Sequence, residues 1–119
     1  MSYVDGYVLA VPKKKIKEYI AMARFGEKIW RKHGALDYKE CVGEDLKHKL
    51  FVPFTRFMKT KPGETVVFSY IVFKSRAHRD RVNAAVMKEM EKMPHPETMP
   101  FDPKRMVYGG FETIVGFKS

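Results

Sequence analysis

A carboxylate stands between tyrosines in the first strand-like segment of this 119-residue chain, SYVDGYVLAV at 2–11. Asp5 shares its parity along the segment with Tyr3 and Tyr7, and a strand places residues of one parity on one face. Inside a pocket, desolvation would raise the pKa of this carboxyl group and suit it to act as a general base, whereas on a wet face it is only solvated. We expect Asp5 to be the polar anchor of a small-molecule site, with Tyr3 and Tyr7 beside it.

A second candidate region lies near the carboxyl end, in the stretch MVYGGFE at 106–112. Glycine weakens a strand because it has no side chain to pack, so the pair Gly109-Gly110 needs a reason. We expect one glycine to let a helix approach and the other to leave space for a ligand, with a plain β-bulge as the alternative. Tyr108 and Glu112 share the parity of Gly110 and would flank that space.

Two side chains near the end of a helical segment complete the candidate site. Trp30 and His33 lie three residues apart and would supply an aromatic wall and an acid-base group. The alternatives are core packing for Trp30 and a charge at the helix end for His33. In the next strand, Asp37 and Glu40 have opposite parities, so one of them must face away from the pocket. We expect both of these carboxylates to be solvated.

The sequence predicts neither a metal site nor a bound cofactor. Its four histidines are scattered, and its single cysteine, Cys41, has no cysteine partner. It contains no phosphate-binding loop, dinucleotide fingerprint or nucleophile elbow. One cysteine also excludes an internal disulfide, and no signal peptide is recognisable at the start, so we expect a cytoplasmic protein.

The formal net charge of +9 and the pI near 9.7 are typical of a protein with an anionic partner or with a lysine-rich solvated surface. If the two helices run antiparallel, basic residues at the end of the first meet basic residues at the start of the second. We expect a weak anion site there, with a solvated edge as the alternative. Nucleic acid is disfavoured, because the sequence lacks a stacking platform with interleaved basic residues. The residues of this site are Arg31, Lys32, Arg76 and Arg79.

The elements that must position these residues follow from hydrophobic periodicity. Segments rich in valine and aromatic residues predict strands, and apolar residues three and four apart predict helices. No run approaches the roughly 20 apolar residues of a membrane span, so we expect no membrane partner. We expect one domain, residues 1–119. The predicted strands are 2–11, 35–43, 65–73 and 106–117, the predicted helices are 13–33 and 76–93, and two long loops cover 43–63, with an extra strand over 50–59, and 94–104.

The order strand, helix, strand, strand, helix, strand predicts an α+β fold of the ferredoxin-like βαββαβ type. Its four-stranded antiparallel sheet would have the order 4-1-3-2, with both helices on one face. We assign the small side chains of the first strand, such as Val4 and Gly6, to the helix face. This leaves Tyr3, Asp5 and Tyr7 on a face that nothing in the chain covers. A second copy packed face to face would cover it, so we expect a homodimer with a cavity between the two sheets.

Four stretches carry a resemblance to a known family: YVDGYV, WRKHGALDYKEC, ETVVFSYIVFKSRAHRDRVN and MPFDPKRMVYGGFE. They resemble the uncharacterised YbaA-like family within the dimeric α/β-barrel superfamily, and the match runs through nearly the whole chain. The resemblance implies a ferredoxin-like protomer that forms a homodimer, in which the two sheets enclose a barrel-like interior. It implies no particular reaction and no catalytic residue.

The expected function is therefore binding of a small molecule by a cytoplasmic homodimer. One alternative is a cofactor-independent oxygenase or isomerase acting on a small aromatic or carbonyl compound. The other alternative is an anion or nucleic-acid binder that uses the basic edge. The binding protein and the enzyme differ in whether Asp5, Tyr7, Glu112 and Trp30 converge on one enclosed space. A titration with heparin or DNA at different salt concentrations would distinguish the anion binder.

Overall fold

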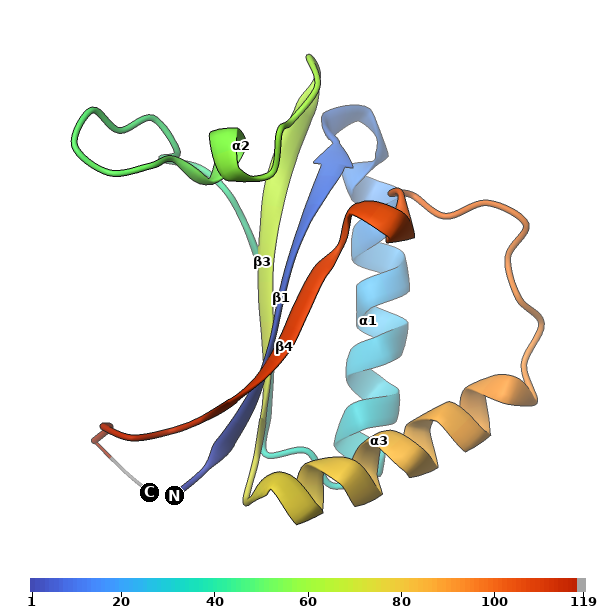
Figure 1. Cartoon of the computed structure of the whole chain (residues 1–119). Coiled ribbons are helices and arrows are strands. Elements are labelled where there is room, and N and C mark those ends of the chain that lie inside the picture. Colours follow the sequence, from blue (N-terminus) through green and yellow to red (C-terminus); the bar gives the residue numbers. More distant parts are fainter. Residues whose placement is uncertain (118–119) are drawn as a thin grey trace.

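The strands form one antiparallel sheet whose order, β2-β3-β1-β4, confirms the predicted order 4-1-3-2 and the ferredoxin-like α+β class (Figure 1). The computed structural model describes residues 1–117. Along these residues, no helix combines the length and the apolar character needed to cross a membrane. The elements are β1 (Tyr3–Pro12), the 3-10 turn η1 (Lys13–Lys15), α1 (Ile16–Lys32), β2 (Asp37–Val42), α2 (Phe54–Phe57), β3 (Glu64–Phe73), α3 (Arg76–Glu91), the 3-10 turn η2 (Pro103–Arg105) and β4 (Val107–Glu112).

The start of α3 and the end of α1 carry the capping residues that the sequence predicted. The side-chain oxygen of Ser75 accepts a hydrogen bond from the backbone N–H of His78 at 3.1 Å, which caps the start of α3. Gly34 follows α1 with a φ of 105°, a left-handed conformation that favours glycine. The last strand is shorter than predicted. It ends at Glu112, opposite Tyr3, the first residue of β1, and one further backbone hydrogen bond, from the N–H of Thr113 to the carbonyl oxygen of Ser2 at 3.0 Å, follows it.

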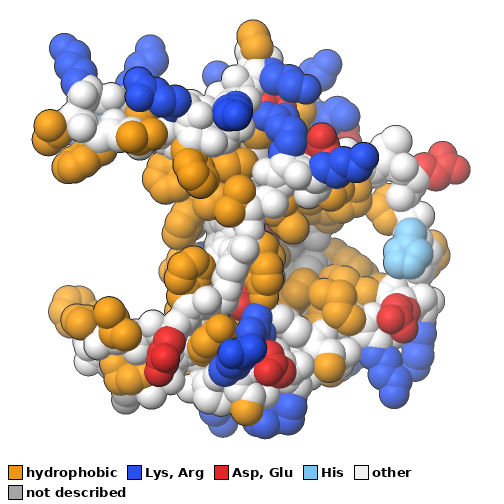
Figure 2. All heavy atoms as spheres, viewed as in Figure 1, with side chains coloured by type: hydrophobic (Ala, Val, Ile, Leu, Met, Phe, Trp, Pro, Cys, Tyr) orange, Lys and Arg blue, Asp and Glu red, His pale blue; other side chains and the backbone are white. Residues whose placement is uncertain are grey.

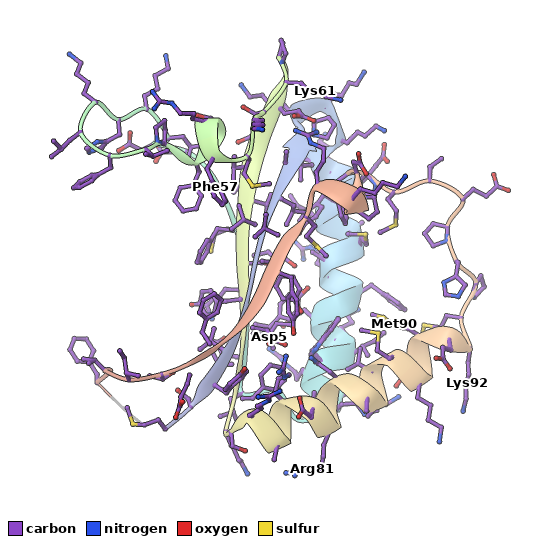
Figure 3. The ribbon with its side chains drawn as sticks, in the orientation of Figure 1. Asp5, Phe57, Lys61, Arg81, Met90 and Lys92 are labelled. Carbon is purple, nitrogen blue, oxygen red and sulfur yellow. The ribbon has the colours of Figure 1, made fainter. Side chains whose placement is uncertain are left out.

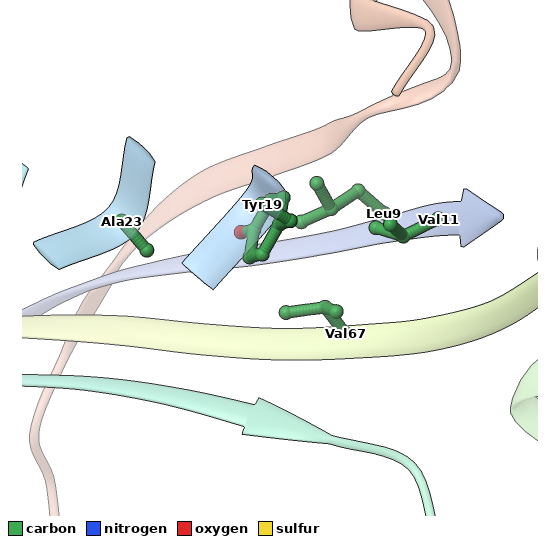
Figure 4. Packing of buried hydrophobic residues seen from close by; sticks show 5 residues of the cluster. All are labelled: Leu9, Val11, Tyr19, Ala23 and Val67. Carbon is green, nitrogen blue, oxygen red and sulfur yellow. The ribbon is translucent and has the colours of Figure 1, made fainter. Parts of the chain in front are cut away.

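The predicted assignment of the two faces of β1 is wrong. Leu9 and Val11 are buried against Tyr19 and Ala23 of α1, with Val67 of β3 beside them (Figure 4). The tyrosines and the carboxylate of β1 therefore face the helices, and the small residues face away. Helices that cover a sheet leave a gap that must be filled at close-packed density, and large side chains fill it where small ones cannot.

The two long helices are not laid side by side. Helix α3 crosses the carboxyl-terminal end of α1 at a large angle (Figure 1). Trp30 near the end of α1 contacts Asn83 in the middle of α3, and His33 contacts Glu89 near its end. This differs from the antiparallel arrangement that we expected. Because α3 diverges from α1, part of the sheet lies beneath neither helix (Figure 1). Phe101 and Met106, from the segment that joins α3 to β4, lie beside this part.

The opposite face of the sheet is apolar and only partly covered. Phe68 is 44% exposed and Phe111 is 60% exposed on this face. At one end the segment 43–57 projects over it, and at the other end the segment 113–117 projects the same way (Figure 1). Figure 2 shows a hollow between these two projections, lined by hydrophobic side chains. The uncovered face that we predicted therefore exists, but it carries a different set of residues.

The predicted strand over 50–59 is also wrong, because the segment contains the single-turn helix α2. Phe54, Phe57 and Met58 are spaced three and four residues apart, which places them on one side of a helical turn. Met58 is buried, and the ring of Phe54 packs edge-on against Phe68 at a centroid distance of 6.3 Å. The apolar alternation that suggested a strand thus packs α2 against the open face of the sheet, where Figure 3 shows Phe57.

The ring of Tyr3 explains Gly110 of β4, whereas a Cβ on Gly109 would make only an ordinary contact with the ring of Phe111. The pairing of β1 with β4 runs without interruption from Tyr3 opposite Glu112 to Val8 opposite Val107, so there is no β-bulge in this pair. A Cβ on Gly110 would lie 2.5 Å from the hydroxyl oxygen of Tyr3 and 2.9 Å from its ring. On the other face, the ring of Phe111 would lie 3.4 Å from a Cβ on Gly109. The space that we assigned to a ligand beside Gly110 is filled by Tyr3.

Candidate functional site

Asp5 is fully buried on the helix side of the sheet, with a relative exposure of 0%. Its Oδ1 accepts hydrogen bonds from Nη1 of Arg79 and from the hydroxyl of Tyr108, both at 3.1 Å. Its Oδ2 accepts a hydrogen bond from Nδ2 of Asn83 at 3.0 Å. We call these four residues the Asp5 clamp; Figure 3 labels its central residue. The clamp joins β1, β4 and α3, and its charge is balanced by Arg79.

Two aromatic side chains extend the Asp5 clamp. Nε1 of Trp30 donates a hydrogen bond to Oδ1 of Asn83 at 3.0 Å, which ties α1 to the clamp. The guanidinium carbon of Arg79 lies 5.0 Å from the centre of the Tyr3 ring, a cation–π distance. Nε of Arg79 lies 2.9 Å from Oδ1 of Asp80, a second ion pair of this guanidinium group. Because both oxygens of Asp5 have partners and its charge has a counter-ion, this carboxylate is not free to hold a ligand.

A cavity of about 290 Å³ lies farther along the same side of the sheet. Its walls come from β1, β2, β3, α1, α3 and the segment 94–106. Figure 3 shows Met90 rising from α3 toward this space. Methionine side chains adapt to the shape of what they contact, and four of them line the cavity. The aromatic side chains of its wall are Tyr7, Tyr19, Trp30, Tyr38 and Phe101, and the methionines are Met22, Met87, Met90 and Met106.

Glu40 is the carboxylate of this cavity. Its Oε1 accepts a hydrogen bond from the hydroxyl of Tyr19 and its Oε2 one from the hydroxyl of Tyr38, each at 2.7 Å. Burial raises the pKa of both tyrosines, and the hydrogen bond to Glu40 and the charge of Glu40 raise them further. The two hydroxyl groups therefore keep their protons and act as donors to the carboxylate.

A row of polar side chains crosses the sheet at the level of Glu40. Glu40 is paired with Ser69 of β3, Ser69 with Tyr7 of β1, and Tyr7 with Tyr108 of β4. Burial raises the pKa of Tyr7, and the charge of Asp5 contributes in the same direction. Within residues 1–117, no hydrogen-bond partner is found for the Tyr7 hydroxyl. The row therefore offers a hydroxyl group and a carboxylate to the same apolar space.

The segment 101–106, which contributes Phe101 and Met106 to the cavity wall, is held by an ion pair near its end. Arg105 donates two hydrogen bonds to Glu64, from Nη1 to Oε2 at 2.7 Å and from Nη2 to Oε1 at 2.9 Å. These bonds lower the pKa of Glu64 to about 2. Upstream, the ring of Phe101 packs edge-on against Tyr19 at a centroid distance of 5.8 Å. The ion pair thus anchors this segment four residues from Phe101, which lines the cavity.

The structure divides the predicted ligand site. Tyr7 and Trp30 line the cavity, whereas Tyr3, Asp5 and Tyr108 belong to the surroundings of Arg79. The remaining predicted residues do not reach the cavity: His33 contacts Glu89 at 2.7 Å, Gly110 lies under Tyr3, and Glu112 is exposed at the sheet edge. This cavity lies on the helix side of the sheet, whereas the predicted cavity between two sheets concerns a dimer and stays a prediction.

Sequence reasoning missed Glu40, Tyr19 and Tyr38. The signal was present, because Tyr38 and Glu40 are two residues apart in a strand and therefore share a face. Of the two carboxylates with opposite parity, Asp37 is the one that faces solvent, where it pairs with Lys39 at 2.6 Å. We had expected both to be solvated, and Glu40 is not.

The predicted anion site is not assembled as one patch. Arg79 is turned inward to Asp5. Arg31 pairs with Glu27 at 3.0 Å, and Lys32 pairs with Glu89 at 3.0 Å. The basic residues that we grouped are thus engaged separately by carboxylates, apart from Arg76.

Comparisons with known proteins find close relatives of unknown function. A family model described as "Protein of unknown function (DUF1428)" matches residues 2–103, from β1 into η2. The chain is 40% identical over 115 residues to "Uncharacterized protein YbaA" of Escherichia coli and of Shigella flexneri, which covers 97% of this chain and 98% of each relative. A solved structure, "De novo designed protein Foldit4", aligns over 98% of this chain and 100% of its own, with 13% identity and a TM-score of 0.44. The matches to the family and to its relatives confirm the resemblance to the YbaA-like family.

Proposed function

The chain belongs to the DUF1428 family of proteins of unknown function, and we propose that it binds a small, largely apolar molecule in the cavity between its sheet and its helices. The main support for this proposal is the composition of the cavity wall. Aromatic and methionine side chains make up most of it, and a few polar groups, chiefly Glu40, Ser69 and Tyr7, converge on it. Pockets of this composition, about 300–1,000 Å³ in volume, are typical of small-molecule sites, and this cavity lies near the lower end of that range.

Trp30 provides a direct test, because it is the single tryptophan of the chain and it lines the cavity. We expect 2-phenylethanol to change the tryptophan fluorescence with a saturable dependence on concentration. Ser69→Met should abolish this change, because Ser69 is buried and a longer side chain there would project into the cavity. Ser69→Ala, which leaves the volume free, should keep it. A flat titration of the unmodified protein up to millimolar concentrations would contradict the proposal.

We also propose that the protein is a homodimer joined through the open face of the sheet. This proposal is supported by exposed aromatic residues such as Phe68 and Phe111, and by the two projecting segments that flank them (Figure 2). Monomers rarely leave a contiguous apolar surface of this kind in water, and a second copy related by a two-fold axis covers it with the same surface. A face-to-face dimer leaves the cavity free, since the cavity lies on the other side of the sheet.

Sedimentation at micromolar concentration tests the dimer. We expect the unmodified protein to sediment as a dimer and Phe111→Glu to sediment as a monomer, because the substitution places a charge in the apolar interface. Phe25→Glu is the matched control, since it makes the same substitution at an exposed phenylalanine of α1, away from the open face of the sheet. A monomeric unmodified protein would overturn the proposal.

A further inference from the structure

Resting on the proposed function, we propose that the ligand is an organic amine, whose ammonium group pairs with Glu40 inside the aromatic wall of the cavity. The proposal begins with an unbalanced charge. Within residues 1–117, no lysine, arginine or histidine forms an ion pair with Glu40, although this carboxylate is half-buried and the chain carries a net charge of +9. A carboxylate removed from water is costly unless a positive charge or sufficient hydrogen bonds compensate it.

The two tyrosines compensate Glu40 only in part. Each carboxylate oxygen has two acceptor positions, and Tyr19 and Tyr38 occupy one position on each oxygen. The hydroxyl groups are neutral, so they orient the carboxylate without cancelling its charge. Two acceptor positions and one negative charge remain available at the edge of the cavity, which is what an ammonium group with several N–H donors requires.

The cations of the surrounding structure are engaged elsewhere. Lys39 also borders the cavity, but its ammonium group is bound to Asp37, 2.6 Å away on the exposed side of β2. Arg79 is paired with Asp5 in the clamp. Arg24 lies in a shallow groove on the outer side of Glu40 and forms no ion pair with it. No positive charge of the described chain therefore occupies the place that the ligand would take.

The wall beside Glu40 suits a cation as well as an apolar body. The rings of Trp30 and Tyr38 lie 6.0 Å apart at 40°, and the rings of Tyr19 and Phe101 lie 5.8 Å apart at 71°. Aromatic faces attract ammonium groups through the negative charge of their ring faces, and more strongly when water is excluded. A neutral alcohol would use the same apolar wall but leave the charge of Glu40 unbalanced, and a carboxylate would be repelled by it.

Three probes with one aromatic ring and different end groups test this inference: phenethylamine, 2-phenylethanol and 3-phenylpropionate. Each is titrated at neutral pH against the unmodified protein while the fluorescence of Trp30 is recorded. We expect phenethylamine to bind at least about tenfold more tightly than 2-phenylethanol, and 3-phenylpropionate to bind most weakly. Glu40→Gln should remove the advantage of the amine and leave the affinity for the alcohol nearly unchanged. Glu44→Gln removes the same charge at an exposed position and should leave the advantage intact.

The outcomes separate this inference from the proposed function. If the alcohol binds as tightly as the amine, the preference for amines is overturned while the binding site stands. If none of the probes binds, both proposals fail. If the amine keeps its advantage in Glu40→Gln, the selectivity does not come from Glu40 and the inference is wrong. If Glu40→Gln folds poorly, the comparison of the three probes on the unmodified protein still tests the preference for amines. Glu40→Asp keeps the charge and should therefore retain this preference.

Discussion

Asp5 and Glu40 lie on the same face of the same sheet, on neighbouring levels and separated by β3, yet their surroundings differ. Asp5 is fully buried and has a guanidinium group, an amide and a hydroxyl as partners. Glu40 is half-buried and has two hydroxyl groups as partners. The first carboxylate is neutralised by its own chain, so its role is structural. The second is oriented but not neutralised, and it opens on a cavity.

The largest expected effect comes from removing the charge of Asp5. Asp5→Asn keeps the shape of the side chain but removes the buried partner of Arg79, which is left with the exposed Asp80, 2.9 Å from its Nε, as its ion-pair partner. Breaking a buried ion pair destabilises a protein by about 3 kcal/mol. Urea unfolding of the purified protein measures this loss. Asp37→Asn, at an exposed carboxylate, should change the free energy of unfolding by less than about 0.5 kcal/mol. A loss below about 1 kcal/mol for Asp5→Asn would show that the clamp is not a structural ion pair.

Glu64 should behave as Asp5 does, because it also has an arginine partner, and acid tests this. The pKa of Glu64 is lowered to about 2 in the folded state from an ordinary value of 4.5. Its contribution to stability is therefore complete above about pH 4.5 and is lost as the pH falls toward 2. Since solvent screens this pair in part, we expect a loss of about 2 kcal/mol over that window, less than the full pKa shift would give. Arg105→Gln should lose that contribution at pH 7 and show a flatter acid dependence; an unchanged slope of unfolding free energy against pH would contradict this assignment.

A smaller effect is expected beside the clamp, at Gly110. Gly110→Ala places a methyl group against the ring of Tyr3, which must move away from Arg79. Overpacking of this kind costs about 1 kcal/mol at the low end of its range. Tyr3→Leu should relieve the clash, so the double variant is expected to lose less stability than the sum of the two single variants. Simple additivity in urea unfolding would show that Tyr3 does not fix the identity of residue 110.

The elements and their order were predictable because they follow from short-range periodicity and from local chemistry, as Ser75 and Gly34 illustrate. The sequence did not predict which face of β1 packs against the helices. Both sets of alternating residues in β1 contain apolar side chains, so either set could face the helices until their positions are known. The role of Gly110 depends on the ring of Tyr3, more than 100 residues away in sequence. The cavity depends on the angle at which α3 crosses α1. The hydrophobic periodicity of each helix predicts the helix itself but not this angle.

Glu40 gives the smallest expected effect on stability, and this is the sharpest test of the comparison. Glu40→Gln keeps an oxygen that accepts a hydrogen bond from one tyrosine, and it removes a charge that has no counter-ion within the described chain. The loss of one hydrogen bond, roughly 0.5–1.5 kcal/mol, is offset by the relief of that unbalanced charge. We therefore expect the free energy of unfolding to change by about 0.5 kcal/mol or less, against about 3 kcal/mol for Asp5→Asn.

The two variants make a matched pair, since each replaces a carboxylate by its amide on the same face of one sheet. Urea unfolding of both at neutral pH, without added amine, measures the contrast. With saturating phenethylamine, the unmodified protein should gain stability and Glu40→Gln should gain less, because binding to the folded state alone raises the free energy of unfolding. If Glu40→Gln is destabilised as strongly as Asp5→Asn in the absence of amine, then Glu40 belongs to the framework of the fold. The unbalanced charge on which the choice of ligand rests would then be compensated within the protein itself.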